Sequence, residues 1–453
     1  MSLEPLYTAE EMKRAEAGHD VDELMARAGR VVAEEAMRRF PDARRFVAVC
    51  GKGANGGDGR IAVDVIAAAG REAVVSDDVE GADVILDALF GTGFHGEPRE
   101  DAAGKIEAIN AAAAPVVSVD LPSGVDASTG EVAGACVDAT VTVTMHGRKV
   151  GLELAPGRFH AGEVVVADIG LEHAETKHRV VTAEILERVP RKQADQNKYT
   201  AGTVLVVGGS RGLTGAPSLA AEAAFRADAG YVAVAVPAST LSVFEQRLLE
   251  AVKLACPEDD GRISPRAVEP IAEFARKAGS VALGPGLGRG DGPHEVVARL
   301  LADLDVPAVV DADGLFGLEP FSRSGETVLT PHEGELARLL GEESTWVAAH
   351  RLEAARRATE RFGCVCLLKG ADTLVAAPGE GVWVCSLGTP ALATAGSGDV
   401  LTGIVASFLA KGLEARLAAA AAATAHQLAS REVPQAGAVA SDLIGALPLI
   451  LER

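Results

Sequence analysis

Two glycine-rich segments of this 453-residue chain combine side chains that can move protons with backbone that can approach a phosphate. The first, GKGANGGDG at residues 51–59, carries Asn55 and Asp58 among its glycines. The second, ATAGSGDVLTG at residues 393–403, places Asp399 directly after Gly398. Glycines let backbone N–H groups reach a phosphate, and a nearby carboxylate can accept a proton from an attacking hydroxyl. We therefore expect a nucleotide site with acid–base chemistry at each segment.

The first segment is open to more than one interpretation. Gly51, Gly53 and Gly56 satisfy the G-x-G-x-x-G pattern of dinucleotide-binding turns. An ordinary pyrophosphate turn does not need Asn55 and Asp58, however, and these two side chains could instead only cap the following helix. The segment lacks G-K-[ST], which excludes a Walker-type phosphate loop.

Three further motifs follow aliphatic runs in the first third of the chain. They place Asp87 before the GTG triplet of residues 91–93, Asp120 and Ser123 in DLPSG, and Lys149 in HGRKVG. Oxygen-bearing side chains with one lysine suit either general acid–base catalysis or a hard cation with oxygen ligands. His95 and His146 lie nearby in sequence, where a loop histidine is more often merely solvated.

The second half of the chain carries a comparable series of strand-end motifs. They are GGSRGLTGAP at 208–217, GPGLG at 284–288, DADGL at 311–315, TPHEGE at 330–335 and LKGADT at 368–373. The backbone N–H groups of residues 395–399 would form an anion-binding nest at a helix start, with Asp399 inside it. Asp399 could alternatively be a plain first-turn acid that the helix dipole favours.

The elements that position these motifs read as strands alternating with helices. We predict strands at 45–50, 84–86, 116–119, 141–145 and 164–167, then at 203–207, 232–236, 281–283, 308–310, 327–329, 365–368 and 383–385. A helix is predicted over 60–69 and another from 399 to about 410. This alternation indicates α/β domains with parallel sheets, in which ligands bind at the carboxyl edge of the strands. A polar segment at 188–200 suggests two domains, 1–187 and 188–453.

Composition excludes several classes of protein. The formal charge of −21 disfavours nucleic acid and anionic membranes as partners. The six cysteines contain no CxxC pair, so a zinc ribbon is not expected, and we predict that they are buried as small hydrophobic residues. The N-terminus lacks an apolar signal core, so we expect a cytoplasmic protein. We also expect a homo-oligomer of undetermined size.

Together, the motifs of residues 6–155 resemble the N-terminal epimerase domain of the NAD(P)HX repair enzymes. The resemblance implies a Rossmann-like domain in which Asn55, Asp87 and Ser123 bind potassium, while Asp120 and Lys149 are the acid–base pair. One departure is Ala54, where the family usually has asparagine. The resemblance implies that the substrate contacts are Ala54, Asn55, Gly56, Gly57, Asp58, Gly91, Thr92, Gly93, Phe94, His95, Gly96, Glu97 and Asp120.

The motifs of residues 188–450 resemble the ADP/ATP-dependent NAD(P)HX dehydratases, which have a ribokinase-like fold. The resemblance implies that Asp399 contacts substrate and acts as base, and that Glu335 organises magnesium. Substrate contacts would come from Ala216, Gly288, His332 and Asp399. Adenine-nucleotide contacts would come from Lys369, Gly370, Ala371, Asp372, Thr373 and Gly398.

The two resemblances imply one pathway in two three-layer αβα domains. The first domain would interconvert the R and S hydrates of NADH and NADPH. The second would dehydrate the S form with ADP or ATP, by phosphorylating the ring hydroxyl and eliminating phosphate. The alternatives are a ribokinase-like vitamin or sugar kinase fused to a non-catalytic nucleotide-binding domain, an oxidoreductase, or a first domain that serves only as a binding module. The preference for ADP or ATP stays open, as does that for NADHX or NADPHX.

Overall fold

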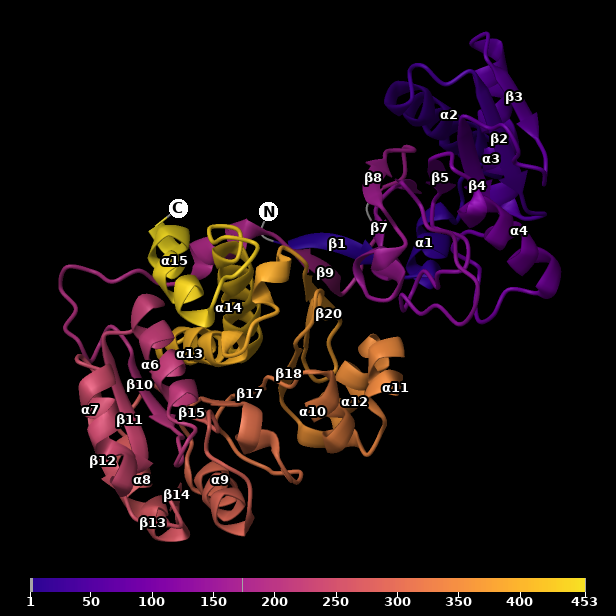
Figure 1. The fold of residues 1–453 in the computed structure, drawn as a ribbon. Coiled ribbons are helices and arrows are strands. Elements are labelled where there is room, and N and C mark those ends of the chain that lie inside the picture. The colour runs from indigo at the N-terminus through magenta and orange to yellow at the C-terminus, as the bar shows by residue number, and fades with distance from the viewer. Residues whose placement is uncertain (1–2, 173, 453) are drawn as a thin grey trace. The chain divides into compact units, whose positions relative to one another are not determined.

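The computed structural model describes residues 3–172 and 174–452, which divide into two compact units (Figure 1). The N-terminal unit comprises residues 5–179 and a short segment at 348–351. The C-terminal unit comprises the described residues before 5 together with 180–347 and 352–452. The division at residue 179 falls before the polar segment in which we placed the boundary. The reason is that Val181 and Ile185 are buried in the core of the C-terminal unit.

The N-terminal unit is built on a six-stranded parallel sheet of order β3-β2-β4-β5-β6-β8. Side chains that alternate along β2 serve two layers, because successive residues of a strand point to opposite faces. Phe46 and Ala48 pack with helices α2 and α3, while Val49 packs with α4 on the other face. The strands of this sheet are β2 (Arg45–Cys50), β3 (Glu72–Val75), β4 (Val84–Ala88), β5 (Val116–Val119), β6 (Val141–Met145) and β8 (Glu163–Ala167). Two further strands, β1 (Leu3–Tyr7) and β7 (Arg148–Lys149), lie outside it and pair with each other. The helices are α1 (Ala9–Glu16), α2 (Val21–Arg39), α3 (Ala54–Ala68), α4 (Glu100–Ala111) and α5 (Val150–Glu153).

The C-terminal unit contains strands in the order β12-β11-β10-β15-β16-β17-β18-β19-β20. The pairs are parallel from β12 to β18, and β18-β19-β20 are antiparallel. The strands are β9 (His178–Val181), β10 (Thr203–Val207), β11 (Tyr231–Pro237), β12 (Val252–Cys256), β13 (Glu258–Asp259), β14 (Arg262–Ile263), β15 (Ser280–Leu283), β16 (Ala308–Val310), β17 (Thr327–Leu329), β18 (Val365–Leu368), β19 (Thr373–Ala376) and β20 (Val382–Cys385). The helices are α6 (Gly215–Arg226), α7 (Leu241–Arg247), α8 (Val268–Ala275), α9 (Asp291–Asp303), α10 (Glu333–Leu340), α11 (Ser344–Ala349), α12 (Arg351–Phe362), α13 (Ser397–Ala410), α14 (Ala415–Ala429) and α15 (Ala440–Glu452).

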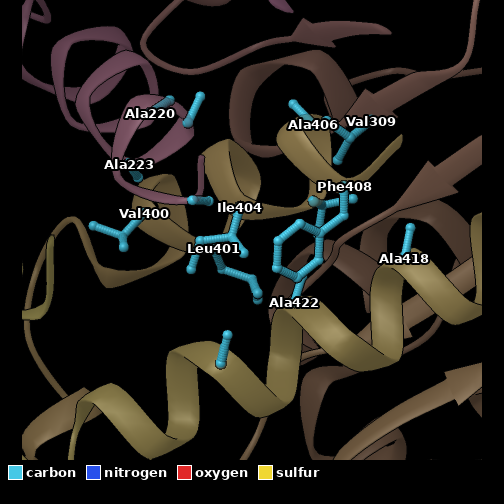
Figure 2. Packing of buried hydrophobic residues seen from close by; sticks show 14 of the residues in the cluster. Ala220, Ala223, Val309, Val400, Leu401, Ile404, Ala406, Phe408, Ala418 and Ala422 are labelled. Atoms are coloured by element: carbon cyan, nitrogen blue, oxygen red, sulfur yellow. The ribbon is translucent and has the colours of Figure 1, made fainter. Parts of the chain in front are cut away.

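Small side chains let helix α13 pack closely against its neighbours, which places its N-terminus. Figure 2 shows Leu401, Ile404 and Phe408 of α13 between the alanines of α6 and those of α14. A Cβ added at Gly403 would lie 2.1 Å from the Ala220 carbonyl oxygen, so only glycine permits this approach of α13 to α6. The abundant alanine of the sequence thus forms a tightly packed helical layer behind the sheet.

The α/β architecture with large parallel sheets is confirmed. One boundary was wrong, because α3 begins at Ala54 and not at residue 60. The glycine-rich segment is therefore the first turn of the helix as well as the loop before it. The error arose because glycine lowers helix propensity, whereas here the packing of Gly56 and Gly59 against Gly51 and Ala88 outweighs that preference.

Over the described ranges, helices long and apolar enough to cross a bilayer are absent. The cysteines are free thiols, four of them buried, while Cys50 and Cys364 are half-buried.

Two candidate active sites at the ends of parallel strands

A cavity of about 990 Å³ opens where β2, β4, β5 and β6 of the N-terminal unit end. It is lined by the glycine-rich turn, by residues 89–95 and by carboxylates that include Glu16, Asp58 and Asp120. Lys149 lies among the cationic side chains of the lining. Polar groups that converge in a single cavity at the carboxyl edge of a parallel sheet form the usual position for a ligand site.

Close backbone contacts shape the glycine-rich turn beside this cavity. A Cβ added at Gly51 would lie 2.0 Å from the Leu89 carbonyl oxygen, and one at Gly56 would lie 2.1 Å from the Gly51 carbonyl oxygen. Gly53 is the N-cap of α3, and no side chain caps that helix end. The first N–H groups of α3 are therefore available for a phosphate or another anion.

Asp120 and Lys149 form a buried ion pair at the floor of the cavity. Lys149 Nζ lies 2.5 Å from Asp120 Oδ1, and it also donates to Thr144 Oγ1 at 2.9 Å and to the Met145 carbonyl at 2.7 Å. Lys149 is fully buried, and Asp120 has a left-handed backbone with φ 67°. A non-glycine residue held in this region is a sign of a constrained, functional position. The pair presents one carboxylate of fixed orientation to the cavity.

Two further carboxylates face the same cavity in an environment that favours their protonated forms. Burial raises the pKa of Asp58 to about 8, and the charges of Asp120 and Glu16 add to this shift. Burial likewise raises the pKa of Glu16, with a further contribution from Asp120. At neutral pH Asp58 can therefore donate a proton or a hydrogen bond. Sequence reasoning missed Glu16, because it ends a charged surface-like helix and no motif marks it.

The residues predicted to hold potassium are joined by hydrogen bonds, with Phe90 linking Asn55 to Ser123. Ser123 donates from its hydroxyl to Asp87 Oδ1 at 2.6 Å, and Asn55 Nδ2 donates to the Phe90 carbonyl at 2.8 Å. Asp87 is fully buried and accepts hydrogen bonds from Ser118 Oγ and from the Ser123 N–H, each at 2.8 Å. A buried carboxylate of this kind, next to hydroxyl and amide oxygens, fits a hard monovalent cation.

Most of the predicted substrate contacts of this unit line the cavity. The residues from the predicted set that do so are Ala54, Asn55, Asp58, Gly91, Thr92, Gly93, Phe94, His95, Glu97 and Asp120. Gly56, Gly57 and Gly96 do not line it. Gly56 and Gly57 instead pack against Gly51 and Met25, whereas a Cβ at Gly96 would meet open space.

The C-terminal unit brings a second charged group to the edge of its sheet. Lys369 Nζ lies 2.7 Å from Asp311 Oδ1 and 3.7 Å from Glu335 Oε2. Thr402 donates to Asp311 Oδ2 at 2.6 Å and so ties helix α13 to the end of β16. Burial opposes the charge of Lys369, but Asp311 and Glu335 keep the pKa of its ammonium above the usual value. The DADGL motif marked Asp311 as a strand-end acid, but its pairing with Lys369 was not foreseen.

Asp399 lies in the first turn of α13, beside Lys369 and the glycines of the nest. Gly396 caps this helix with φ 89°, and a Cβ at Gly398 would lie 3.3 Å from Lys369 Nζ. Burial raises the pKa of Asp399 to about 7, and Asp311 adds to the shift while Lys369 opposes it. Asp399 is thus a carboxylate that can take up and release a proton near neutral pH.

The remaining predicted residues surround this group. His332 caps helix α10: its Nδ1 accepts from the Gly334 N–H at 3.0 Å, and its backbone N–H donates to Glu335 Oε2 at 2.8 Å. Asp313 accepts from the Gly288 N–H at 3.0 Å. Ala216 is half-buried beside Gly286. In the LKGADT segment, Asp372 and Thr373 are buried, whereas Gly370 and Ala371 are exposed.

Both halves of this chain are similar in sequence to known proteins. Residues 21–77 and 66–151 match the family model described as YjeF-related protein N-terminus, and residues 204–449 match the model described as NAD(P)H-hydrate dehydratase. The chain is 38% identical to the bifunctional NAD(P)H-hydrate repair enzyme of Moorella thermoacetica, over 95% of this chain and 92% of that protein. It is 30% identical to the enzyme of the same name from Escherichia coli, over 98% of this chain and 94% of that protein.

A solved structure is similar to the C-terminal unit. It is the ADP/ATP-dependent NAD(P)H-hydrate dehydratase from Bacillus subtilis, co-crystallised with ATP and Mg²⁺. It is 28% identical, with a TM-score of 0.54, and the match covers 60% of this chain and 97% of that chain.

Proposed function

This chain belongs to the family of bifunctional NAD(P)H-hydrate repair enzymes, and we propose that Asp120 with Lys149 carries its epimerase reaction and Asp399 its dehydratase reaction. The N-terminal unit is the NAD(P)H-hydrate epimerase and the C-terminal unit the NAD(P)H-hydrate dehydratase. The observation that carries the assignment is the placement of one buried or half-buried carboxylate beside a lysine at each sheet edge.

For dehydration, Asp399 accepts the proton of the ring hydroxyl while that oxygen attacks the terminal phosphoryl group of the adenine nucleotide. The bond from that phosphorus to the bridging oxygen breaks, which releases AMP from ADP or ADP from ATP. Hydroxide is a poor leaving group, and its conversion to a phosphate ester makes departure easy. Phosphate then leaves as the ring nitrogen's lone pair forms the new bond, and loss of a ring proton restores the dihydronicotinamide. The N–H groups of the α13 nest and Lys369 stabilise the charge on the phosphoryl group.

The adenine nucleotide is held by Lys369, the segment from Gly370 to Thr373, and Gly398. Magnesium fits the same edge of the sheet, where Glu335 supplies a carboxylate, and it would neutralise charge on the phosphates. Glu335 already accepts a hydrogen bond from the His332 backbone N–H, so we assign it an indirect role, in which it orients the groups around the magnesium ion and is not itself a ligand.

For epimerisation, Asp120 exchanges a proton with the substrate near the carbon that bears the hydroxyl. Lys149 keeps the carboxylate in one orientation and stabilises its charge in a site shielded from water. The glycine-rich turn and the loop at residues 91–97 hold the hydrated nucleotide. Because the dehydratase is expected to accept only the S hydrate, an epimerase on the same chain makes the R hydrate usable.

The experiment that tests this assignment follows recovery of NADH absorbance from separated R and S hydrates with ADP or ATP. We expect both hydrates to be converted, the R form by way of the S form. The alternative of a vitamin kinase joined to a non-catalytic domain finds no support in the relatives, and it would give a stable phosphorylated product with no return of NADH.

The pKa of Asp399 makes dehydration dependent on pH. Because a general base works only when ionised, we expect kcat for the S hydrate to fall as pH drops through about 7 and to level off above it. Initial rates at saturating nucleotide, measured between about pH 5.5 and about pH 8.5, will check this. A kcat that is constant across this range would argue against Asp399 as the base.

Potassium is predicted to support the epimerase alone. We expect that replacing potassium by a tetramethylammonium salt of equal ionic strength lowers epimerisation and lowers the unfolding temperature of the N-terminal unit, because Asp87 then lacks a countercharge. Asp87→Asn should abolish both responses. Dehydration of the S hydrate serves as the control and should not change. Equal loss of both activities would contradict a site at Asn55, Asp87 and Ser123.

A further inference from the structure

An arginine cluster, defined here as Arg211, Arg262 and Arg289, lies along the turn at Gly261 and the loop at Gly288 in the C-terminal unit. Its concentration of positive charge stands out in a chain whose formal charge is −21. Neither the epimerase nor the dehydratase chemistry described above uses these three side chains. They come from three separate segments, the loop after β10, the β14 strand and the loop before α9.

Arg262 lies along the glycine loop that precedes α9. A Cβ added at Gly288 would lie 3.2 Å from Arg262 Cδ and 3.4 Å from its Nε, and one at Gly290 would lie 3.7 Å from its Nη1. Ser210 Oγ lies 3.2 Å from the same point at Gly288. The Arg262 side chain therefore lies alongside the backbone from Gly288 to Gly290.

Arg211 approaches from the other side of the short β13–β14 hairpin. The backbone N–H of Arg211 donates to the Gly261 carbonyl at 2.9 Å, and a Cβ at Gly261 would lie 3.3 Å from Arg211 Nε. Ser210 and Arg262 are joined by an isolated β-bridge, which fixes the two arginine-bearing segments side by side. Arg211 is exposed and forms no ion pair within the described residues.

Arg289 completes the cluster and connects it to the candidate active site. Its Nε lies 3.2 Å from Asp313 Oδ1, and its guanidinium lies 5.1 Å from the centre of the Phe316 ring. Asp313 also accepts the Gly288 N–H, and its charge contributes to the raised pKa of Asp399. Asp313 therefore interacts both with the cluster and with the dehydratase base.

Three carboxylates, Asp313, Asp260 and Glu258, lie around the cluster, and among the described residues only Asp313 forms a close ion pair with it. Asp313 is paired with Arg289, whereas Asp260 is 82% exposed and lies 3.9 Å from Arg262. Glu258 affects Arg211 only at longer range. The backbone contributes to the cluster as well, because Gly288 and Gly290 have positive φ and no side chain caps the N-terminus of α9. Guanidinium groups beside the uncapped N-terminus of a helix are common recognition elements for phosphate.

We propose that the arginine cluster binds a phosphate group of the hydrated dinucleotide during dehydration. The inference rests on the proposed function of the C-terminal unit, together with the resemblance that implies a substrate contact at Gly288. The adenine nucleotide is assigned to Lys369, the residues that follow it and Gly398, which leaves the cluster for the second nucleotide. Two parts of the hydrated dinucleotides carry phosphate that the cluster would recognise. One is the diphosphate, which NADHX and NADPHX share, and the other is the 2′-phosphate, which only NADPHX has.

The test compares wild-type enzyme with Arg211→Ala, Arg262→Ala and the double variant, using S-NADHX and S-NADPHX as substrates. A charge-assisted contact is worth about a tenfold change in affinity or more, so we expect KM for the hydrate to rise by at least about tenfold in the double variant. We expect kcat and the KM for ATP to stay unchanged. Arg299→Ala on helix α9 is the matched control, since its side chain is comparably exposed and pairs only with Glu295.

The pattern of loss distinguishes the two phosphate sources. An equal rise in KM for both hydrates identifies the diphosphate, and a rise for S-NADPHX alone identifies the 2′-phosphate. Unchanged KM values for both hydrates, or a rise only for ATP, would overturn the proposal. Calorimetric titration of each variant with NADH and NADPH gives a readout that does not need turnover. If wild-type enzyme failed to dehydrate either hydrate, the proposed function would fail independently of these affinities.

Discussion

Replacing Asp399 by alanine will stop dehydration of both hydrates while leaving their interconversion intact. The variant removes the group that accepts the hydroxyl proton, and loss of a general base lowers kcat by about 10²–10⁴-fold. The R hydrate will be affected as strongly as the S hydrate, because the R form must be epimerised and then dehydrated. Epimerisation itself will proceed, since Asp120 and Lys149 are untouched. Chromatography of the two hydrates and absorbance of NADH measure the two steps separately.

Asp399→Asn separates loss of charge from loss of shape. The amide keeps the size of the side chain but cannot accept the proton, so we expect the same loss of kcat. The protein should not be destabilised, because burial and the charge of Asp311 already disfavour ionised Asp399. Asp442→Asn in α15 is the control for removal of an acidic residue from this unit. If Asp399→Asn dehydrated the S hydrate at the wild-type rate, the assignment of the base would be wrong.

Replacing Asp120 by alanine will stall the R hydrate only. A mixture of the two hydrates should then react until the S form is consumed and stop there, whereas wild-type enzyme converts the whole mixture. The loss of epimerisation should be about 10²–10⁴-fold, as for removal of a general acid–base group. Dehydration of pure S hydrate should be unchanged, because Asp399 and Lys369 belong to the other unit.

Asp120→Ala also leaves Lys149 buried without its carboxylate. Removing one partner of a buried ion pair costs about 3–5 kcal/mol, so the N-terminal unit of this variant should unfold at lower temperature. Asp120→Asn keeps an oxygen that can accept from Lys149, and it should lose activity with a smaller loss of stability. Asp138→Asn, which removes an exposed carboxylate paired with His160, is the control. Wild-type epimerisation by Asp120→Asn would rule out proton exchange at this residue.

Local sequence determined the layers of both units and most of the cavity lining. Continuous runs of valine, isoleucine and leucine form strands buried on both faces, and in a parallel sheet their carboxyl ends must meet at one edge. The motifs that follow these strands are therefore brought together whatever the details of packing. This is why Asp120 and Lys149, which are 29 residues apart, could be assigned to one site before their contact was known.

Only the tertiary structure decided which neighbours each charged group has. Glu16 reaches the epimerase cavity from helix α1, and nothing in its own segment distinguishes it from the other acids of that helix. Asp311 becomes the partner of Lys369 through packing over a separation of 58 residues. The raised pKa of Asp399 depends on burial and on the charges of Asp311 and Lys369. The arginine cluster forms because the β13–β14 hairpin packs beside the loop that carries Ser210, which is distant in sequence. Periodicity reports how a segment folds, whereas electrostatic energy depends on distances between segments that only the packed chain sets.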